Sequence, residues 1–206
     1  MKKAVMGIVM LILVVCAPAQ AFALTAIDFT GVTTDFTNGS WSLGFEFTTN
    51  QAISVTHLGF YDDLKNGLLE SHSVGIFDVT TTLLVASGTV GNADSLDGFF
   101  RYTSIVPVDL AANHAYRIAA VTLRDNYTWG TTGYVVDPAI TYTKDVYSAS
   151  GTLVYPAQSD GISNAWFGPN FKFDESGNNA VPEPASLGLL GSGLMGLIGF
   201  NRRKRK

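Results

Sequence analysis

An oxygen-rich segment is the first place where this sequence could do chemistry. Asp62, Asp63, Asn66 and Glu70 lie close together between two strand-like segments. Carboxylate and amide oxygens are the ligands that Ca²⁺ takes, about six to eight at a time, although the spacing is not that of an EF-hand. Asp62, Asp63 and Glu70 are therefore candidate ligands of a structural calcium ion. The alternative is a solvated acidic turn.

A second segment, residues 124–130, combines aromatic rings with short polar side chains. Tyr127 and Trp129 are rings that can stack on the apolar faces of sugars, and Asp125 and Asn126 can bind sugar hydroxyls. We therefore predict an exposed loop in which these four residues contact a sugar. The alternative is that the two rings fold back and cover one end of the domain.

No catalytic constellation is visible. The three histidines, His57, His72 and His114, show no spacing typical of a zinc site. Residues 24–180 contain no G-x-S-x-G elbow, and their sixteen acidic residues give no basis for choosing a catalytic pair. We expect a protein that is not an enzyme and needs no cofactor beyond structural calcium. An extracellular hydrolase of glycans or esters, or a purely structural module, is the alternative.

The elements that must position these residues are strands. Eight segments alternate apolar and polar residues and are rich in Thr, Val, Phe and Tyr: 41–48, 53–60, 72–79, 83–90, 99–106, 115–123, 140–148 and 166–173. Turn-forming Gly, Asn and Asp separate them. The pattern predicts an all-β fold over residues 24–173, an antiparallel, jelly-roll-like β-sandwich. Residues 174–181 are small and polar and predict a linker.

The N-terminal end predicts export. A basic start precedes an apolar run from residue 4 to 15, and Ala21 and Ala23 satisfy the small-x-small cleavage rule. Residues 1–23 are therefore a predicted signal peptide. Cleavage after Ala23 would take away the single cysteine, Cys16, so the mature chain would have no disulfide. The alternative is lipidation of Cys16, which the bulky Val15 before it disfavours.

The C-terminal end, residues 182–206, predicts an anchor. Pro182-Glu183-Pro184 precedes an uncharged segment, residues 185–200, that would rise roughly 24 Å as a helix, close to the ~30 Å of a bilayer core. We predict a transmembrane helix there. The cluster after it should stay on the cytoplasmic side; it consists of Arg202, Arg203, Lys204, Arg205 and Lys206.

The net charge of −4 hides an acidic body. Residues 24–180 contain six basic and sixteen acidic side chains, a net charge of −10. This charge disfavours nucleic acid as a partner, and it is compatible with cations or neutral polysaccharide.

The C-terminal features together resemble the PEP-CTERM sorting signal of exported bacterial proteins. The resemblance implies recognition by an exosortase, a membrane protease, with a cut at or near Pro182-Glu183-Pro184, in bacteria that make exopolysaccharide. The same tail is also known as an ice-binding-protein C-terminal domain, a name that describes the tail only. Residues 45–123 also resemble an uncharacterised sandwich domain common in PEP-CTERM proteins; the matching pieces include residues 45–48, 58–62 and 74–78.

Together these features predict an exported protein of the cell surface or extracellular matrix. It would pass through the inner membrane, held there transiently by its C-terminal helix, and be processed by an exosortase-type protease. Exopolysaccharide is its predicted ligand.

Overall fold

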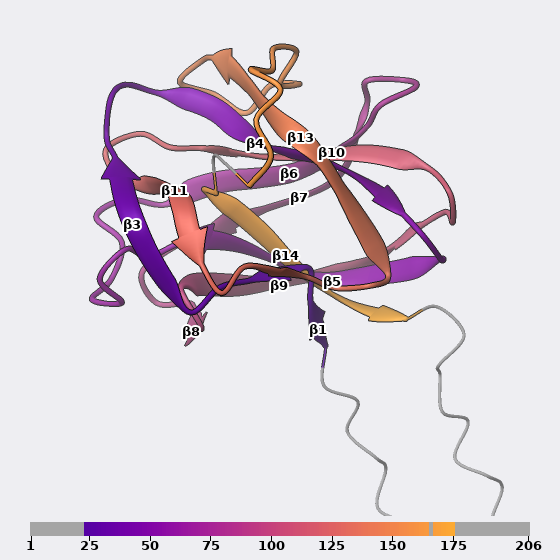
Figure 1. The fold of residues 1–206 in the computed structure, drawn as a ribbon, viewed down its shortest axis with the longest axis horizontal. Coiled ribbons are helices and arrows are strands. Elements are labelled where there is room, and N and C mark those ends of the chain that lie inside the picture. Colours follow the sequence, from indigo (N-terminus) through magenta and orange to yellow (C-terminus); the bar gives the residue numbers. More distant parts are fainter. Residues whose placement is uncertain (1–22, 165–166, 176–206) are drawn as a thin grey trace, which may run out of the picture. The chain divides into compact units, whose positions relative to one another are not determined.

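The structure, a computed structural model, describes residues 23–164 and 167–175, and every regular element in them is a β-strand (Figure 1). The strands in chain order are β1 (Leu24–Thr25), β2 (Ile27–Asp28), β3 (Gly31–Phe36), β4 (Trp41–Thr49), β5 (Ile53–Tyr61), β6 (His72–Asp78), β7 (Leu84–Val90), β8 (Ser95–Asp97), β9 (Phe100–Leu110), β10 (Ala115–Val121), β11 (Tyr127–Thr132), β12 (Val135–Val136), β13 (Ile140–Ala149) and β14 (Pro169–Glu175).

The strands form two five-stranded antiparallel sheets and two small ribbons. One large sheet has the order β1-β14-β5-β9-β8 and the other β13-β4-β10-β6-β7. The ribbons pair β11 with β3 and β12 with β2. Phe47 of one large sheet meets Phe171 of the other with ring centroids 4.9 Å apart. The predicted all-β antiparallel sandwich is therefore confirmed.

The strand order within the large sheets is that of a jelly roll. The neighbours β1-β14-β5-β9 and β4-β10-β6-β7 account for eight strands. If these eight strands alone are renumbered 1 to 8 along the chain, the first sheet has the order 1-8-3-6 and the second has the order 2-7-4-5. These are the orders of a jelly roll built from two Greek keys. Strand β13 extends one sheet beside β4, and β8 extends the other beside β9.

All eight predicted strand segments correspond to strands, with ends shifted by a few residues. They match β4, β5, β6, β7, β9, β10, β13 and β14. The ribbon of β3 and β11 was not predicted, because Gly31–Phe36 has no alternation of apolar residues and Gly130 interrupts Tyr127–Thr132. These two strands form through their mutual backbone pairing, in which Tyr127 lies opposite Phe36.

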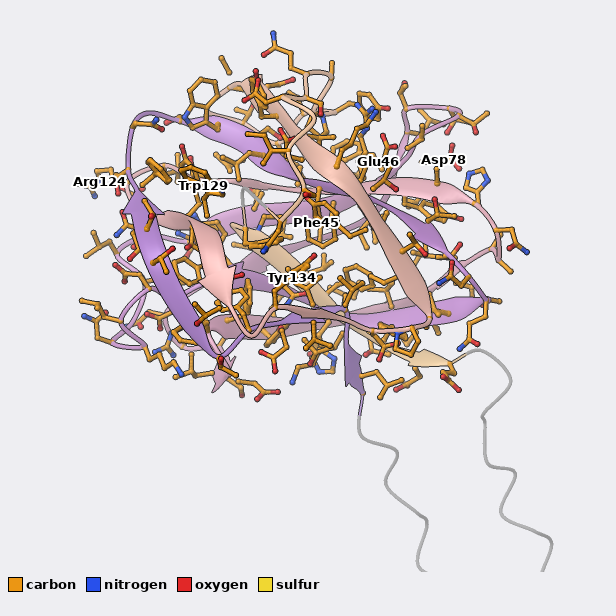
Figure 2. The ribbon with its side chains drawn as sticks, in the orientation of Figure 1. Phe45, Glu46, Asp78, Arg124, Trp129 and Tyr134 are labelled. Atoms are coloured by element: carbon orange, nitrogen blue, oxygen red, sulfur yellow. The ribbon has the colours of Figure 1, made fainter. Side chains whose placement is uncertain are left out.

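The core is aromatic and lies between the two large sheets. Figure 2 shows Phe45 near the middle of the domain, with Tyr134 close to it in the same view. The largest side chains that are almost wholly buried are Tyr61, Phe45, Phe47, Phe60, Phe100, Phe167, Phe171, Phe173, Ile27, Ile53, Leu58 and Ile76. Burying one such side chain stabilises a fold by about 1.5–3 kcal/mol, so this cluster fixes the sandwich.

The outer face of β4 is also covered, which the alternation alone did not predict. The segment after β13 crosses this face: Ser42 Oγ donates to the Val154 carbonyl at 2.7 Å, and Arg117 Nη1 donates to the Pro156 carbonyl at 2.6 Å. Arg117 also bonds Glu46 at 2.8 Å, so the polar side chains beneath the segment are satisfied. These contacts hold the segment in place beside β4 and β13.

Several predictions fall on residues that the structure does not describe. They are residues 1–22 of the signal peptide, 176–181 of the linker and the whole segment 182–206. At the start of the predicted linker, Asp174 and Glu175 instead continue β14 and lie opposite Ser54 and Ile53. The described part of the chain contains no helix with the length and hydropathy to cross a membrane.

Candidate functional site

The predicted calcium ligand Asp62 is buried in a network of protein donors. Arg101 Nε donates to Asp62 Oδ2 at 2.7 Å. The backbone N–H groups of Asn66 and Gly67 donate to the same carboxylate at 3.1–3.2 Å. The Asp62 carboxylate therefore closes the turn after β5 and neutralises an arginine.

The two other predicted calcium ligands have separate partners. Asp63 Oδ2 accepts from Asn126 Nδ2 at 2.7 Å, and Glu70 Oε1 contacts Arg124 at 2.6 Å. Across residues 23–164 and 167–175, no three His, Cys, Asp or Glu side chains gather in a way that could hold a metal ion. The structure thus places Asp62, Asp63 and Glu70 in three separate contacts and not around one point.

The predicted exposed loop at residues 124–130 is wrong for Asp125. This side chain is buried: its carboxylate accepts from the backbone N–H groups of Leu69 and Glu70 at 3.0–3.1 Å and from His72 Nε2 at 2.8 Å. The sequence could not show these contacts, because the partners lie more than fifty residues away. Asp125 ties the 62–70 turn to the end of β10.

The other three residues of that segment are split between interior and surface. Tyr127 is buried at the start of β11, as the alternative of inward-folded rings predicts, whereas Trp129 is 41% exposed. Asn126 is half-buried and bonds Asp63. Phe36 of β3 stacks on both rings, with centroids 5.7 Å from Tyr127 and 6.1 Å from Trp129. Of the two rings, only that of Trp129 is exposed to solvent.

Tyr127 nevertheless contributes to a small aromatic pocket, which we call the aromatic pocket throughout. It measures about 220 Å³ and is lined by Asn38, Trp41, Leu43, Tyr127, Tyr147 and Asp160. Strand β4 supplies Trp41 and Leu43, β11 supplies Tyr127, and β13 supplies Tyr147. The register of β13 with β4 places Tyr147 opposite Leu43. With Asp160 from the segment after β13, four separate parts of the chain meet in the pocket.

Asn38 organises one wall of the aromatic pocket. Its side-chain carbonyl oxygen accepts from Trp41 Nε1 at 2.9 Å and from the Tyr127 hydroxyl at 2.6 Å. Burial raises the pKa of Tyr127, so the ring stays neutral. Among the described residues the Asn38 amide nitrogen has no hydrogen-bond partner, which leaves its two N–H groups available for a ligand.

Tyr147 and Asp160 form the opposite wall. The Tyr147 ring meets Trp41 edge-on, with centroids 5.8 Å apart and planes at 88°. The Tyr147 hydroxyl donates to Asp160 Oδ1 at 2.9 Å, and this bond raises the pKa of Tyr147. Oδ2 of Asp160 accepts no hydrogen bond from the part of the chain that the structure describes.

A buried carboxylate fixes the loop that carries Asp160. Asp145 has no exposed surface, and its oxygens accept from the backbone N–H groups of Asp160 at 3.0 Å and Ile162 at 2.7 Å. Strand β13 therefore positions both Tyr147 and, through Asp145, the backbone of Asp160. A pocket held this way needs little reorganisation when a ligand enters.

Comparison with known families covers both the sandwich and the tail. A family model described as Domain of unknown function (DUF4082) matches residues 29–167, which include every residue of the aromatic pocket. The chain belongs to the DUF4082 family. A second model, the PEP-CTERM protein-sorting motif, matches residues 180–206. No curated protein is similar enough to the chain to count as a match.

The sorting motif decides the destination of this DUF4082 protein. It marks an exported protein that crosses the membrane, is targeted to an exosortase and ends at the cell surface. The predicted resemblance to PEP-CTERM proteins is confirmed, as is the presence of an uncharacterised body domain before the motif. The family name itself carries no activity.

The aromatic pocket combines apolar walls with hydrogen-bonding groups at its rim. Sugars have the matching character, because their C–H faces pack on aromatic rings while their hydroxyls bind amides and carboxylates. Sequence reasoning missed Asn38, Tyr147 and Asp160 and read Trp41 as a strand residue. The one local signal was the turn-forming pair Asn38-Gly39, which indicates a turn before β4. In the structure Gly39 has a φ of 124°, a conformation that favours glycine.

Proposed function

We propose that this protein is a non-enzymatic component of the cell surface or extracellular matrix whose β-sandwich binds exopolysaccharide in the aromatic pocket. The observation that carries the proposal is the convergence of Trp41, Tyr127 and Tyr147 around a cavity with the Asn38 amide and the Asp160 carboxylate at its rim. Aromatic walls with a few placed polar groups are typical of ligand pockets.

The sorting motif supports the same proposal. The motif targets an exported protein to an exosortase and the cell surface, a location where polysaccharide is an available ligand. The acidic body, with a net charge of −10 over residues 24–180, disfavours retention by anionic lipid or nucleic acid. A neutral polysaccharide avoids this repulsion, so it suits the surface as well as the pocket.

Co-sedimentation tests the binding. The full-length protein, in a detergent without a sugar headgroup, is spun with polysaccharide purified from its host, and the bound fraction is measured. We expect Trp41→Ala to weaken binding about tenfold, which corresponds to ~1.4 kcal/mol, through lost ring contact. Asn38→Ala removes the acceptor of Trp41 Nε1 and of the Tyr127 hydroxyl as well as the amide donors, so it should weaken binding, and its melting temperature is measured alongside to separate binding from stability.

Trp129→Ala is the matched control. This change also removes a tryptophan side chain, but from β11 and outside the pocket lining. It separately tests the sequence-based prediction that Trp129 contacts a sugar. If Trp129→Ala abolishes binding and Trp41→Ala does not, the aromatic pocket is not the site. If the wild-type protein sediments with no polysaccharide at any salt concentration, a purely structural role replaces the proposal.

Intact mass of the protein recovered from its host tests the processing. We expect a chain that starts at Leu24, after cleavage behind Ala23, and ends at or near Pro182-Glu183-Pro184. A mass that still contains Met1 and Lys206 would contradict both cleavages.

A further inference from the structure

We propose that the aromatic pocket selects an uncharged pyranose unit and discriminates against uronates, so that the ligand of this surface is a neutral polysaccharide segment. This inference rests on the proposed function and adds the chemical class of the ligand. It follows from three properties of the pocket: its charge, its size and its donor–acceptor pattern.

The charge comes from Asp160, the one charged residue in the pocket lining that the structure describes. The Asp160 carboxylate accepts a hydrogen bond from the neutral Tyr147 hydroxyl at 2.9 Å, and no arginine or lysine pairs with Asp160 among the described residues. A sugar carboxylate at the rim would therefore meet like charge with no cation to offset it.

The size favours one ring. A pocket of about 220 Å³ is smaller than the roughly 300–1,000 Å³ that hold drug-sized ligands. Its walls, Trp41 and Tyr147, stand at 88° to each other. One pyranose face can pack on one ring while the edge of the sugar faces the other, and the rest of the chain continues outside the pocket.

The polar rim matches hydroxyls in both directions. The Asn38 amide nitrogen offers two donors, and Asp160 Oδ2 offers an acceptor; neither is engaged by the described residues. A sugar hydroxyl can accept from Asn38, and a neighbouring hydroxyl can donate to Asp160. A carboxylate can accept from Asn38 but cannot donate to Asp160, which is the physical basis of the discrimination.

The test compares two classes of probe, neutral and acidic oligosaccharides of equal length, on three forms of the full-length protein. The probes are neutral glucose, galactose or mannose oligosaccharides and an oligogalacturonate, with tryptophan fluorescence as the readout. The forms are the wild type, Asp160→Asn and the control Asp109→Asn, which makes the same charge change at an exposed position of β9 outside the pocket. The basic C-terminal cluster attracts uronates in all three forms alike, so the affinity ratio of the probes is compared between forms.

We expect the wild type to prefer a neutral oligosaccharide. Asp160→Asn should lower that preference about fivefold by removing the repulsion of the uronate, and Asp109→Asn should leave it unchanged. One outcome would overturn the charge selection and leave the proposed function intact. In that outcome neutral oligosaccharides compete with the polysaccharide, but the affinity ratio of neutral to acidic probes is the same in Asp160→Asn as in the wild type. Binding of neither probe class, with no effect of Trp41→Ala on sedimentation, would overturn the proposed function itself.

Discussion

The buried pair of His72 and Asp125 offers a quantitative test of what holds the 62–70 turn to the segment after β10. His72 has no exposed surface. Its Nδ1 lies 2.7 Å from the Val121 carbonyl, its Nε2 lies 2.8 Å from Asp125, and its ring stacks on Phe60 with centroids 3.7 Å apart. Both ring nitrogens therefore have a buried hydrogen-bond partner in the protein.

The change His72→Asn should be costly. It removes the pairing with Asp125 and the contact with Phe60, and it leaves the carboxylate of Asp125 buried with only the backbone donors of Leu69 and Glu70. Breaking a buried pair by removing one partner costs about 3–5 kcal/mol. The remaining backbone bonds place this site at the lower end, ~3 kcal/mol, or roughly 6–12 °C in melting temperature for a domain of this size.

The chain contains a matched control for this experiment. His114 Nε2 lies 2.7 Å from Asp78, nearly the same geometry, but the two side chains are 33% and 18% exposed against 0% and 10% for His72 and Asp125. The measurement is urea and thermal unfolding of His72→Asn and His114→Asn, followed by tryptophan fluorescence in a detergent without a sugar headgroup. It compares the stability lost at the buried pair with the stability lost at the more exposed pair. Equal losses of stability in the two variants would refute the argument that burial makes the first pair costly.

Three further changes test the packing and electrostatics of the sandwich. Gly44→Ala should destabilise by at least ~3 kcal/mol in urea unfolding, because the added Cβ would lie 2.2 Å from the Ile118 carbonyl oxygen; a variant as stable as the wild type would contradict the packing. Tyr134→Phe should leave the melting temperature unchanged or raise it, since this buried hydroxyl has no hydrogen-bond partner among the described residues, and a clear loss would reveal a missing contact. The Thr81 backbone N–H, and then His114, lower the pKa of Asp78 below 3.8. Its stabilising contribution is therefore present above about pH 4 and lost as the pH falls further, and acid titration of Asp78→Asn should show a shallower loss in that window.

The sequence predicted the strands because their signal is local. In Trp41–Thr49 every second side chain faces the core, and Leu43, Phe45 and Phe47 are buried as the alternation requires. The polar residues that alternate with them along β4 carry no such signal. Ser42 and Glu46 are covered by a segment more than a hundred residues later in the chain, and nothing in β4 indicates that cover.

The candidate site shows the opposite case. Asp62 was predicted as a calcium ligand because its segment is rich in oxygen donors, and Asp125 as a sugar contact because it lies beside Tyr127 and Trp129. Both are buried by partners distant in sequence, Arg101 and His72. Tyr127 was predicted to bind sugar; it does line a pocket, though through contacts to Asn38 that its own loop does not contain.

The sequence by itself determined the destination of this protein and the class of its fold. Sorting signals are contiguous, since they are read from an extended or membrane-inserted chain, and the period of two residues in a strand is visible in a short window. The tertiary structure decided which side chains share a site. The aromatic pocket joins Asn38, Trp41, Tyr127, Tyr147 and Asp160 through the register of β4 with β13 and the Asp145-anchored loop. Register and loop anchoring depend on hydrogen bonds between residues far apart in the chain, so no local pattern encodes them.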